Sequence, residues 1–202
     1  DAGIVVVVAA GNDGRNNSAS TNGYGTIGVP GNSPYVITVG ALNTKGSLSR
    51  SDDGMTTYSS KGPTLIDHIA KPDLVAPGNA ILSLRGQGST LDNTYQSNGV
   101  PLSAYSTAPS TQVWDYYQSS GTSMATPMVS ASAALLLQQN PNLTPDQIKA
   151  RLMKTAFKSF PATSTGIDPA TGTVYTVQIM ATNIAGQSRI YTSQIRIVGA
   201  VL

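Results

Sequence analysis

Continuous apolar runs, rather than alternating ones, mark the first strands of the chain. Residues 4–10 read IVVVVAA, and residues 34–42 read PYVITVGAL. Apolar, β-branched runs without alternation are typical of strands that are buried on both faces of a parallel sheet. Shorter apolar segments at 73–76 and 80–84 predict two further strands.

A long helix is predicted after the glycine at position 121. The segment carries Ala and Leu on most of its faces, which suits a buried central helix, and we expect it to start at or near Ser123 and to end near 139–141. Pro127 is compatible with this helix only within the first turn, where its missing N–H would be unpaired in any case.

A second helix follows, and its start is defined by three residues. Thr144 is a suitable N-cap, Pro145 suits the first helical position, and Gln147 completes a capping box. Apolar residues at helical spacing place one face of this helix in the core: Ile148, Leu152, Met153, Ala156 and Phe157.

The last forty residues have a different pattern. Apolar and polar residues alternate at 174–179 and 190–197, with Asn183–Gln187 between them, which predicts a β-hairpin. We therefore expect an α/β fold with a mostly parallel sheet flanked by helices over residues 1–160. A β-rich tail of unassigned role follows at 161–202.

Composition narrows the function classes. Charged residues make up 11% of the chain and the formal net charge is +2, with no clustered basic residues, so the sequence has no nucleic-acid or polybasic membrane signature. The absence of cysteine excludes a cysteine nucleophile, a thiolate metal site and disulfides. No apolar run reaches the roughly 18 residues of a membrane span. This composition fits a bacterial extracellular or cell-envelope protein.

The segment Ser120–Pro127, SGTSMATP, points to nucleophilic catalysis. A serine hydroxyl needs a general base and donors for the developing oxyanion. Ser123 has small neighbours and is expected at a helix N-terminus, where the dipole and a backbone N–H favour negative charge. Taken alone, a serine before a helix is most often a simple N-cap, so the whole motif carries the argument.

The SGTSMATP segment resembles the nucleophile motif of the subtilisin-like serine proteases, the subtilase family. Ala9–Asn12, AAGN, resembles the oxyanion motif of the same family. Thr57–Pro63 resembles its Ser-x-Gly-Pro loop, and Lys71–Gly78 resembles its strand and turn ahead of the nucleophile. The resemblance covers roughly residues 1–158 and implies a subtilisin-like fold, of which this chain is the C-terminal part. The polar stretch 86–118 is longer than the family pattern requires and is expected to be an insertion.

The resemblance also implies the site residues. Ser123 is expected to be the nucleophile and Asn12 the side-chain donor to the oxyanion. Substrate-binding positions are expected at Ala10, Gly11, Gly121 and Thr122. No cofactor and no catalytic metal are implied; a structural calcium ion is left open, without an assigned site.

Two members of the family's catalytic triad have no counterpart in these residues. The triad Asp and His precede the asparagine in the family, whereas the only histidine here, His68, follows it and is expected to lie in a surface loop. We therefore expect the isolated chain to be inactive, with a polypeptide as substrate and the upstream part of the same domain as its partner. The alternative is a catalytically dead binding or assembly module, and an exposed sheet edge would favour homo-oligomers.

Other serine hydrolases fit less well. An α/β-hydrolase requires an Asp and then a His after its serine, and no histidine follows Ser123. The sedolisin proteases share a Gly-Thr-Ser motif but use an aspartate where this chain has Asn12.

Overall fold

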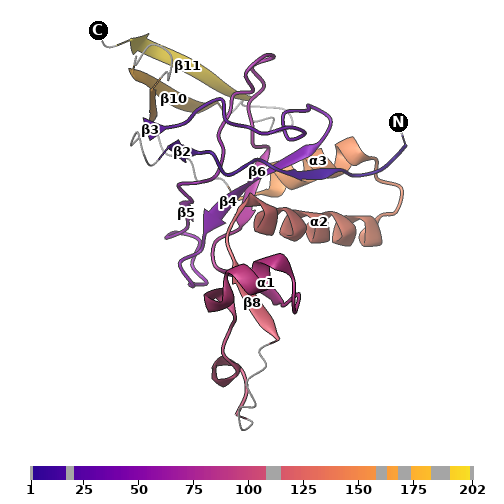
Figure 1. The fold of residues 1–202 in the computed structure, drawn as a ribbon. Helices are drawn as coiled ribbons and strands as arrows, with labels where there is room; N and C mark the ends of the chain where they lie inside the picture. The colour runs from indigo at the N-terminus through magenta and orange to yellow at the C-terminus, as the bar shows by residue number, and fades with distance from the viewer. Residues whose placement is uncertain are drawn as a thin grey trace.

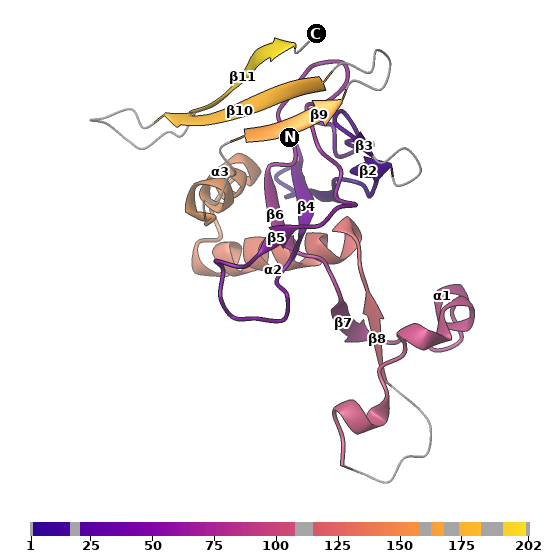
Figure 2. The same cartoon turned by 90° about the vertical axis from the view of Figure 1, so that its left-hand side faces the viewer.

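The computed structural model describes residues 2–16, 21–107, 115–157, 163–167, 174–182 and 192–200. A body formed by a sheet and two helices lies at the centre (Figure 1). An arm with its own short elements extends from one end of the body, and a separate antiparallel sheet lies at the other end (Figure 2).

The central sheet is mostly parallel, as the apolar runs predicted. Strand β4 (Ile37–Asn43) lies in its middle and pairs in parallel with β1 (Val7–Ala9) and β6 (Leu74–Pro77). The short β5 (Gly54–Met55) pairs antiparallel with the end of β4.

Helix α2 (Thr122–Gln139) packs on this sheet through its small residues, and α3 (Pro145–Thr155) follows it. Ala125, Val129 and Ala133 recur every four residues on one face of α2 and join the core with Val39 and other sheet residues. The predicted capping box is present in α3: the hydroxyl of Thr144 accepts the N–H of Gln147, and the Gln147 side chain accepts the N–H of Thr144.

Burial is lower than the apolar pattern predicted. Strand β1 is only three residues long, and its flanking residue Ile4 is 68% exposed, so the expectation of a strand buried on both faces was wrong. Leu135 on α2 is exposed as well, which also corrects the expectation of a fully buried helix. In the described part of the chain, no element covers these surfaces.

The sequence pattern also assigned too many residues of α3 to the core. Ile148 is fully buried and Leu152 packs against the core, whereas Met153 and Phe157 are exposed. The Phe157 ring instead lies 5.8 Å from the guanidinium carbon of Arg50, a cation–π arrangement at the surface.

A buried ion-pair network joins β4, the start of β6 and α3. Asp73 lies 2.7 Å from the ammonium group of Lys71 and 3.2 Å from that of Lys149. The same carboxylate accepts the backbone N–H of Thr38. Burial lowers the pKa of Lys71, and the hydrogen bond to Asp73 opposes that shift. The contacts of Asp73 therefore indicate a structural role, in which its carboxylate joins β4 to α3.

The segment 86–118, expected as an insertion of loops, contains regular structure. It forms the arm together with β7 (Ile81–Leu84), which pairs antiparallel with β8 (Tyr116–Ser119). The described residues between these strands contain the short helices α1 (Thr90–Thr94), η1 (Gln96–Asn98) and η2 (Leu102–Ala104).

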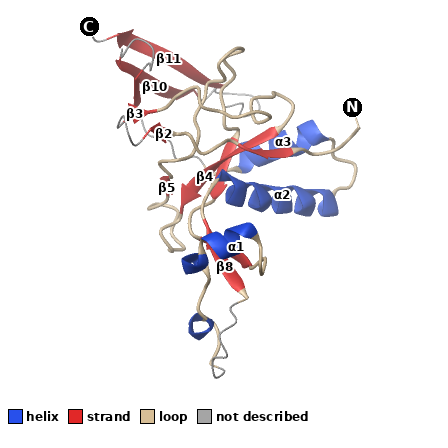
Figure 3. Cartoon of the chain, viewed as in Figure 1, coloured by secondary structure: helices blue, strands red, loops and turns tan. Residues whose placement is uncertain are grey.

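The described residues of the tail contain the two strands of the predicted hairpin and a further strand. Strands β10 (Val174–Thr182) and β11 (Thr192–Ala200) pair antiparallel, and β9 (Thr163–Ile167) pairs with the other edge of β10. Figure 3 shows β10 and β11 at the end of the molecule away from α1. The predicted connection Asn183–Gln187 lies outside the described residues. A second small ribbon, β2 (Arg15–Asn16) with β3 (Thr21–Asn22), follows β1.

Candidate active site

Ser123 lies in the first turn of α2, close to where the sequence placed the start of that helix. The helix begins at Thr122, and Gly121 precedes it with a φ of 155°, a conformation that residues with a side chain rarely adopt. The backbone N–H of Gly121 donates to the carbonyl oxygen of Gly78 at 2.9 Å. This turn leaves Ser123 exposed at the positive end of the helix dipole.

Asn12 follows β1 and meets the start of α2 through its side chain. Its Oδ1 atom accepts two hydrogen bonds from Thr122, one from the backbone N–H at 3.0 Å and one from the hydroxyl at 3.1 Å. The Thr122 hydroxyl oxygen in turn accepts the N–H of Gly11 at 3.2 Å. Two segments about 110 residues apart are thereby joined.

These contacts orient the Asn12 amide. Because Thr122 occupies the oxygen end of the amide, Nδ2 is the end that can donate to a ligand. Ser123 is the next residue after Thr122, so its hydroxyl group and the N-terminus of α2 lie in the segment that the Asn12 side chain contacts. A hydroxyl group, a helix N-terminus and an amide donor are the groups that an acyl-transfer site uses, and the roles of Ser123 and Asn12 in such a site stay predictions.

The other predicted site residues lie in the same two segments. Ala10 is fully buried, with its N–H bonded to Val39 and its carbonyl oxygen to Gly28. Gly11 has a φ of 105°, and Thr122 is fully buried. Thr122 thus contacts Asn12 and Gly11 directly. The substrate-binding role expected of Ala10, Gly11, Gly121 and Thr122 stays a prediction.

The sequence reasoning missed the contribution of Tyr58. Its hydroxyl donates to the carbonyl oxygen of Gly78 at 3.0 Å, the same oxygen that holds Gly121. Its own carbonyl oxygen accepts the N–H of Gly14, two residues after Asn12. The only signal in the sequence was the family-like segment 57–63, which does not reveal such long-range contacts.

His68 and the acidic residues form no second centre in the described part of the chain. His68 lies in an exposed loop with a φ of 53°, as expected of a surface residue. Within the described residues, no group of three or more His, Asp or Glu side chains could hold a metal ion. Asp52 accepts a hydrogen bond from Ser47 in an exposed turn. A structural calcium ion stays a prediction without a site.

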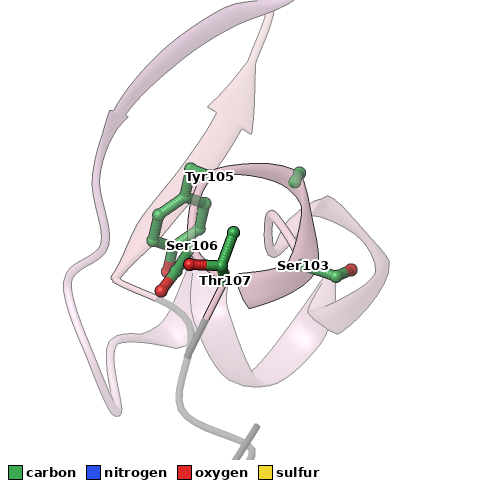
Figure 4. Close-up of a pocket in the computed structure, with 5 residues that line it drawn as sticks. Ser103, Tyr105, Ser106 and Thr107 are labelled. Carbon is green, nitrogen blue, oxygen red and sulfur yellow. The ribbon is translucent and has the colours of Figure 1, made fainter. Parts of the chain in front are cut away.

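A shallow, open depression lies in the arm rather than at Ser123. Figure 4 shows the side chains that line it, which come from the η2 segment and the residues after it, Ser103–Thr107. None of these residues belongs to the segments that carry Asn12 or Ser123. The Tyr105 ring packs edge-on against Tyr116, with ring centres 4.8 Å apart. The described residues that line this depression therefore all belong to the arm.

Sequence comparison finds similarity to one family. The subtilase family (peptidase S8) matches residues 1–191, a span that crosses the predicted boundary at residue 160. Serine protease AprX of Bacillus subtilis (strain 168) is 45% identical over 151 residues, which are 75% of this chain and 30% of AprX. Subtilisin E of the same strain is 35% identical over 154 residues, 76% of this chain and 29% of the relative.

Solved structures give the same result. Sphericase superposes with a TM-score of 0.51 at 29% identity, over 76% of this chain and 40% of its own. Fervidolysin from Fervidobacterium pennivorans, described as a keratinolytic enzyme related to subtilisin, superposes with a TM-score of 0.51 at 31% identity, over 77% of this chain and 19% of its own. The chain spans about 30% of the length of the curated relatives named above. Among the described residues, no helix is both long and apolar enough to cross a bilayer.

Proposed function

The chain belongs to the subtilase family of serine proteases, and on this basis we propose that it carries the nucleophile and oxyanion half of an endopeptidase site. Ser123 attacks the peptide carbonyl, and Asn12 donates to the resulting oxyanion. The substrate is a polypeptide, held next to the segments that contain Ala10, Gly11, Gly121 and Thr122.

The proposed chemistry proceeds through an acyl-enzyme. The Ser123 oxygen forms a bond to the carbonyl carbon while its proton passes to a histidine, and the C–N bond breaks as that proton reaches the departing amine. A water molecule then attacks the acyl-enzyme in the same way, and the carboxylic acid is released as Ser123 regains its proton. The Asn12 Nδ2 and the Ser123 backbone N–H stabilise the negative charge in both steps.

The orientation of the Asn12 amide is the observation that carries this proposal. Two donors on Thr122 hold Oδ1 at 3.0 and 3.1 Å and so direct the donor end of the amide away from Thr122. With Oδ1 held in this way, Nδ2 is left as the end of the amide that a side-chain donor to the oxyanion requires.

We propose that the histidine and the aspartate come from the upstream part of the domain, so the 202 residues alone are inactive. In the part of the chain that the structure describes, no histidine forms a hydrogen bond with Ser123. The alternative is a catalytically dead subtilase-like module, which would keep the fold and bind without hydrolysis.

A fluorophosphonate probe separates these two cases. We expect the isolated chain to form no covalent adduct and the full-length protein to gain one adduct, measured by intact mass. The adduct should disappear in Ser123→Ala of the full-length protein. A full-length protein without an adduct would support the dead module, and labelling of the isolated chain would contradict the need for upstream residues.

Two further proposals concern context. The relatives AprX and subtilisin E come from Bacillus subtilis, which supports a bacterial source, and the absence of cysteine fits the proposed extracellular or cell-envelope location. The exposed residue Ile4 beside β1 and the exposed Leu135 on α2 supply apolar surface for the upstream part or for a second copy. Light scattering across a tenfold range of concentration tests whether two copies of the chain associate, and a constant monomer mass would contradict this association.

A further inference from the structure

Ser60 holds the chain on both sides of Asn12. Its backbone N–H donates to the carbonyl oxygen of Gly11 at 2.9 Å. Its hydroxyl oxygen accepts the backbone N–H of Asp13 at 3.1 Å. These two atoms belong to the two peptide groups that flank the Asn12 Cα, so one residue fixes both planes.

The contact between Ser60 and this segment is tight. Ser60 is fully buried, and a Cβ added to Gly11 would lie 2.8 Å from the Ser60 hydroxyl oxygen. Gly11 also has a φ of 105°, which favours glycine on its own account. The hydroxyl of Ser60 therefore occupies the space that a side chain at position 11 would need, and the segment has little room to shift.

We infer that Ser60 is a positioning residue for the oxyanion donor Asn12, an inference that rests on the proposed function. With both flanking peptide planes fixed, the direction of the Asn12 Cα–Cβ bond is fixed. Thr122 then sets the far end of the side chain by holding Oδ1. Ser60 supplies the backbone half of this arrangement, and its effect on catalysis passes through Asn12.

Ser59 provides a matched control for the loss of a buried hydroxyl. It is also fully buried, and its hydroxyl oxygen also accepts one backbone N–H, that of Ala41 at 3.0 Å. Ala41 lies in β4 and not in the segment of Asn12. Ser59→Ala therefore removes the same type of bond as Ser60→Ala but leaves the Asn12 peptide planes in place.

The first experiment follows the Asn12 side chain directly in the 202-residue chain. Asparagine-selective ¹⁵N labelling gives its NH₂ signal, assigned by its loss in Asn12→Ala. We expect Ser60→Ala to lower the order parameter of this amide into the flexible range, below about 0.6. Ser59→Ala should leave it unchanged, and Ser60→Cys, which keeps a weak acceptor of similar size, should have an intermediate effect.

The second experiment measures kinetics in the full-length protein. We expect Ser60→Ala to lower kcat about tenfold with little change in KM, because small displacements of an oxyanion donor reduce transition-state stabilisation. In the Asn12→Ala background the same substitution should lower kcat less than twofold. Ser60→Cys keeps the test valid if Ser60→Ala does not fold.

The outcomes distinguish this inference from the proposed function. If the full-length protein forms no adduct with the fluorophosphonate probe, the proposed function fails, while the NMR comparison still tests the contact between Ser60 and Asn12. If the wild type is labelled but Ser60→Ala behaves like Ser59→Ala in both experiments, the role of Ser60 is overturned alone. A tenfold loss that persists in the Asn12→Ala background would overturn it as well.

Discussion

Thr122 donates two hydrogen bonds to a single atom of Asn12, one from its backbone N–H and one from its hydroxyl. The backbone donor would be present with any residue except proline at position 122. The hydroxyl is specific to Thr or Ser, and it also accepts the N–H of Gly11. Thr122 thus connects the start of α2 to two consecutive residues, Gly11 and Asn12.

This connection predicts the effect of Thr122→Val in the full-length protein. Valine keeps the shape of threonine but removes both hydroxyl bonds, so the Asn12 amide loses one of its two constraints. Complete loss of an oxyanion donor lowers kcat by about 10²–10³, and we expect roughly a tenfold fall when the donor is only loosened. Steady-state kinetics with a peptide substrate should show this fall in kcat rather than in KM.

Thr56→Val is the matched control for that substitution. The Thr56 side chain is buried and its hydroxyl donates to the Ala41 carbonyl oxygen at 3.1 Å, away from the oxyanion segment. We expect a comparable loss of stability without the loss of kcat. An equal fall in kcat in both variants would show that kcat follows global stability and not the Asn12 contact.

A stability prediction follows from the buried carboxylate of Asp73. Asp73→Asn removes the charge that pairs with both Lys71 and Lys149 and leaves a buried ammonium group without its counter-ion. Removing one partner of a buried ion pair costs about 3–5 kcal/mol, so urea unfolding should show a loss of about 3 kcal/mol. The exposed Asp115 gives the control: Asp115→Asn should change stability by less than about 0.5 kcal/mol. A similar small change in Asp73→Asn would contradict the network.

Local signals explain what the sequence could predict. The start of α3 was predicted from Thr144 and Gln147 because a capping box is a contact between residues three apart. The parallel strands were predicted from their uninterrupted apolar runs, and the positions of Ser123 and Asn12 from family motifs.

The remaining features depend on contacts between distant segments. The roles of Tyr58 and Ser60 were not predicted, because nothing in their neighbours indicates that they bond to residues near Asn12 and Gly78. Periodicity placed Phe157 on the apolar face of α3, but periodicity cannot show whether another element covers that face. Strand β8 was missed because its sequence, YYQS, has no apolar run.

The arm contains a carboxylate whose titration can be followed. The hydrogen bonds from Arg85, and then that from the Gly88 N–H, hold the pKa of Asp92 below its ordinary value of 3.8. Because the folded pKa is the lower one, this contribution to arm stability is present above pH 3.8 and is lost as pH falls through the folded pKa. The Gly88 amide signal in NMR should therefore shift with a midpoint below 3.8.

Two variants test that assignment. Asp92→Asn should abolish the transition at Gly88, because the titrating group is gone. Ser89→Ala removes the hydroxyl that caps α1 but leaves the contact between Arg85 and Asp92, so its midpoint should stay below 3.8. A wild-type midpoint at or above 3.8 would contradict the contact with Arg85.

Removal of the arm should leave the body folded. Its main contacts are internal: Arg85 pairs with Asp92, and the hydroxyl of Tyr117 bonds to the carbonyl oxygens of Leu91 and Tyr95. The backbone N–H of Arg85 donates to the Asp115 carbonyl oxygen at 2.8 Å, so residues 85 and 115 already face each other across the hairpin.

We therefore propose to replace residues 86–114 by Asn-Gly, which favours the tight turn that joins two antiparallel strands. Each halving of loop length lowers the closure cost by about 0.6 kcal/mol, so the urea midpoint of the shortened chain should equal or exceed that of the wild type. In the full-length protein, labelling of Ser123 should also persist, because Gly78 still holds Gly121. A lower midpoint would show that the arm stabilises the body, and lost labelling with an unchanged midpoint would show that the arm takes part in the reaction at Ser123.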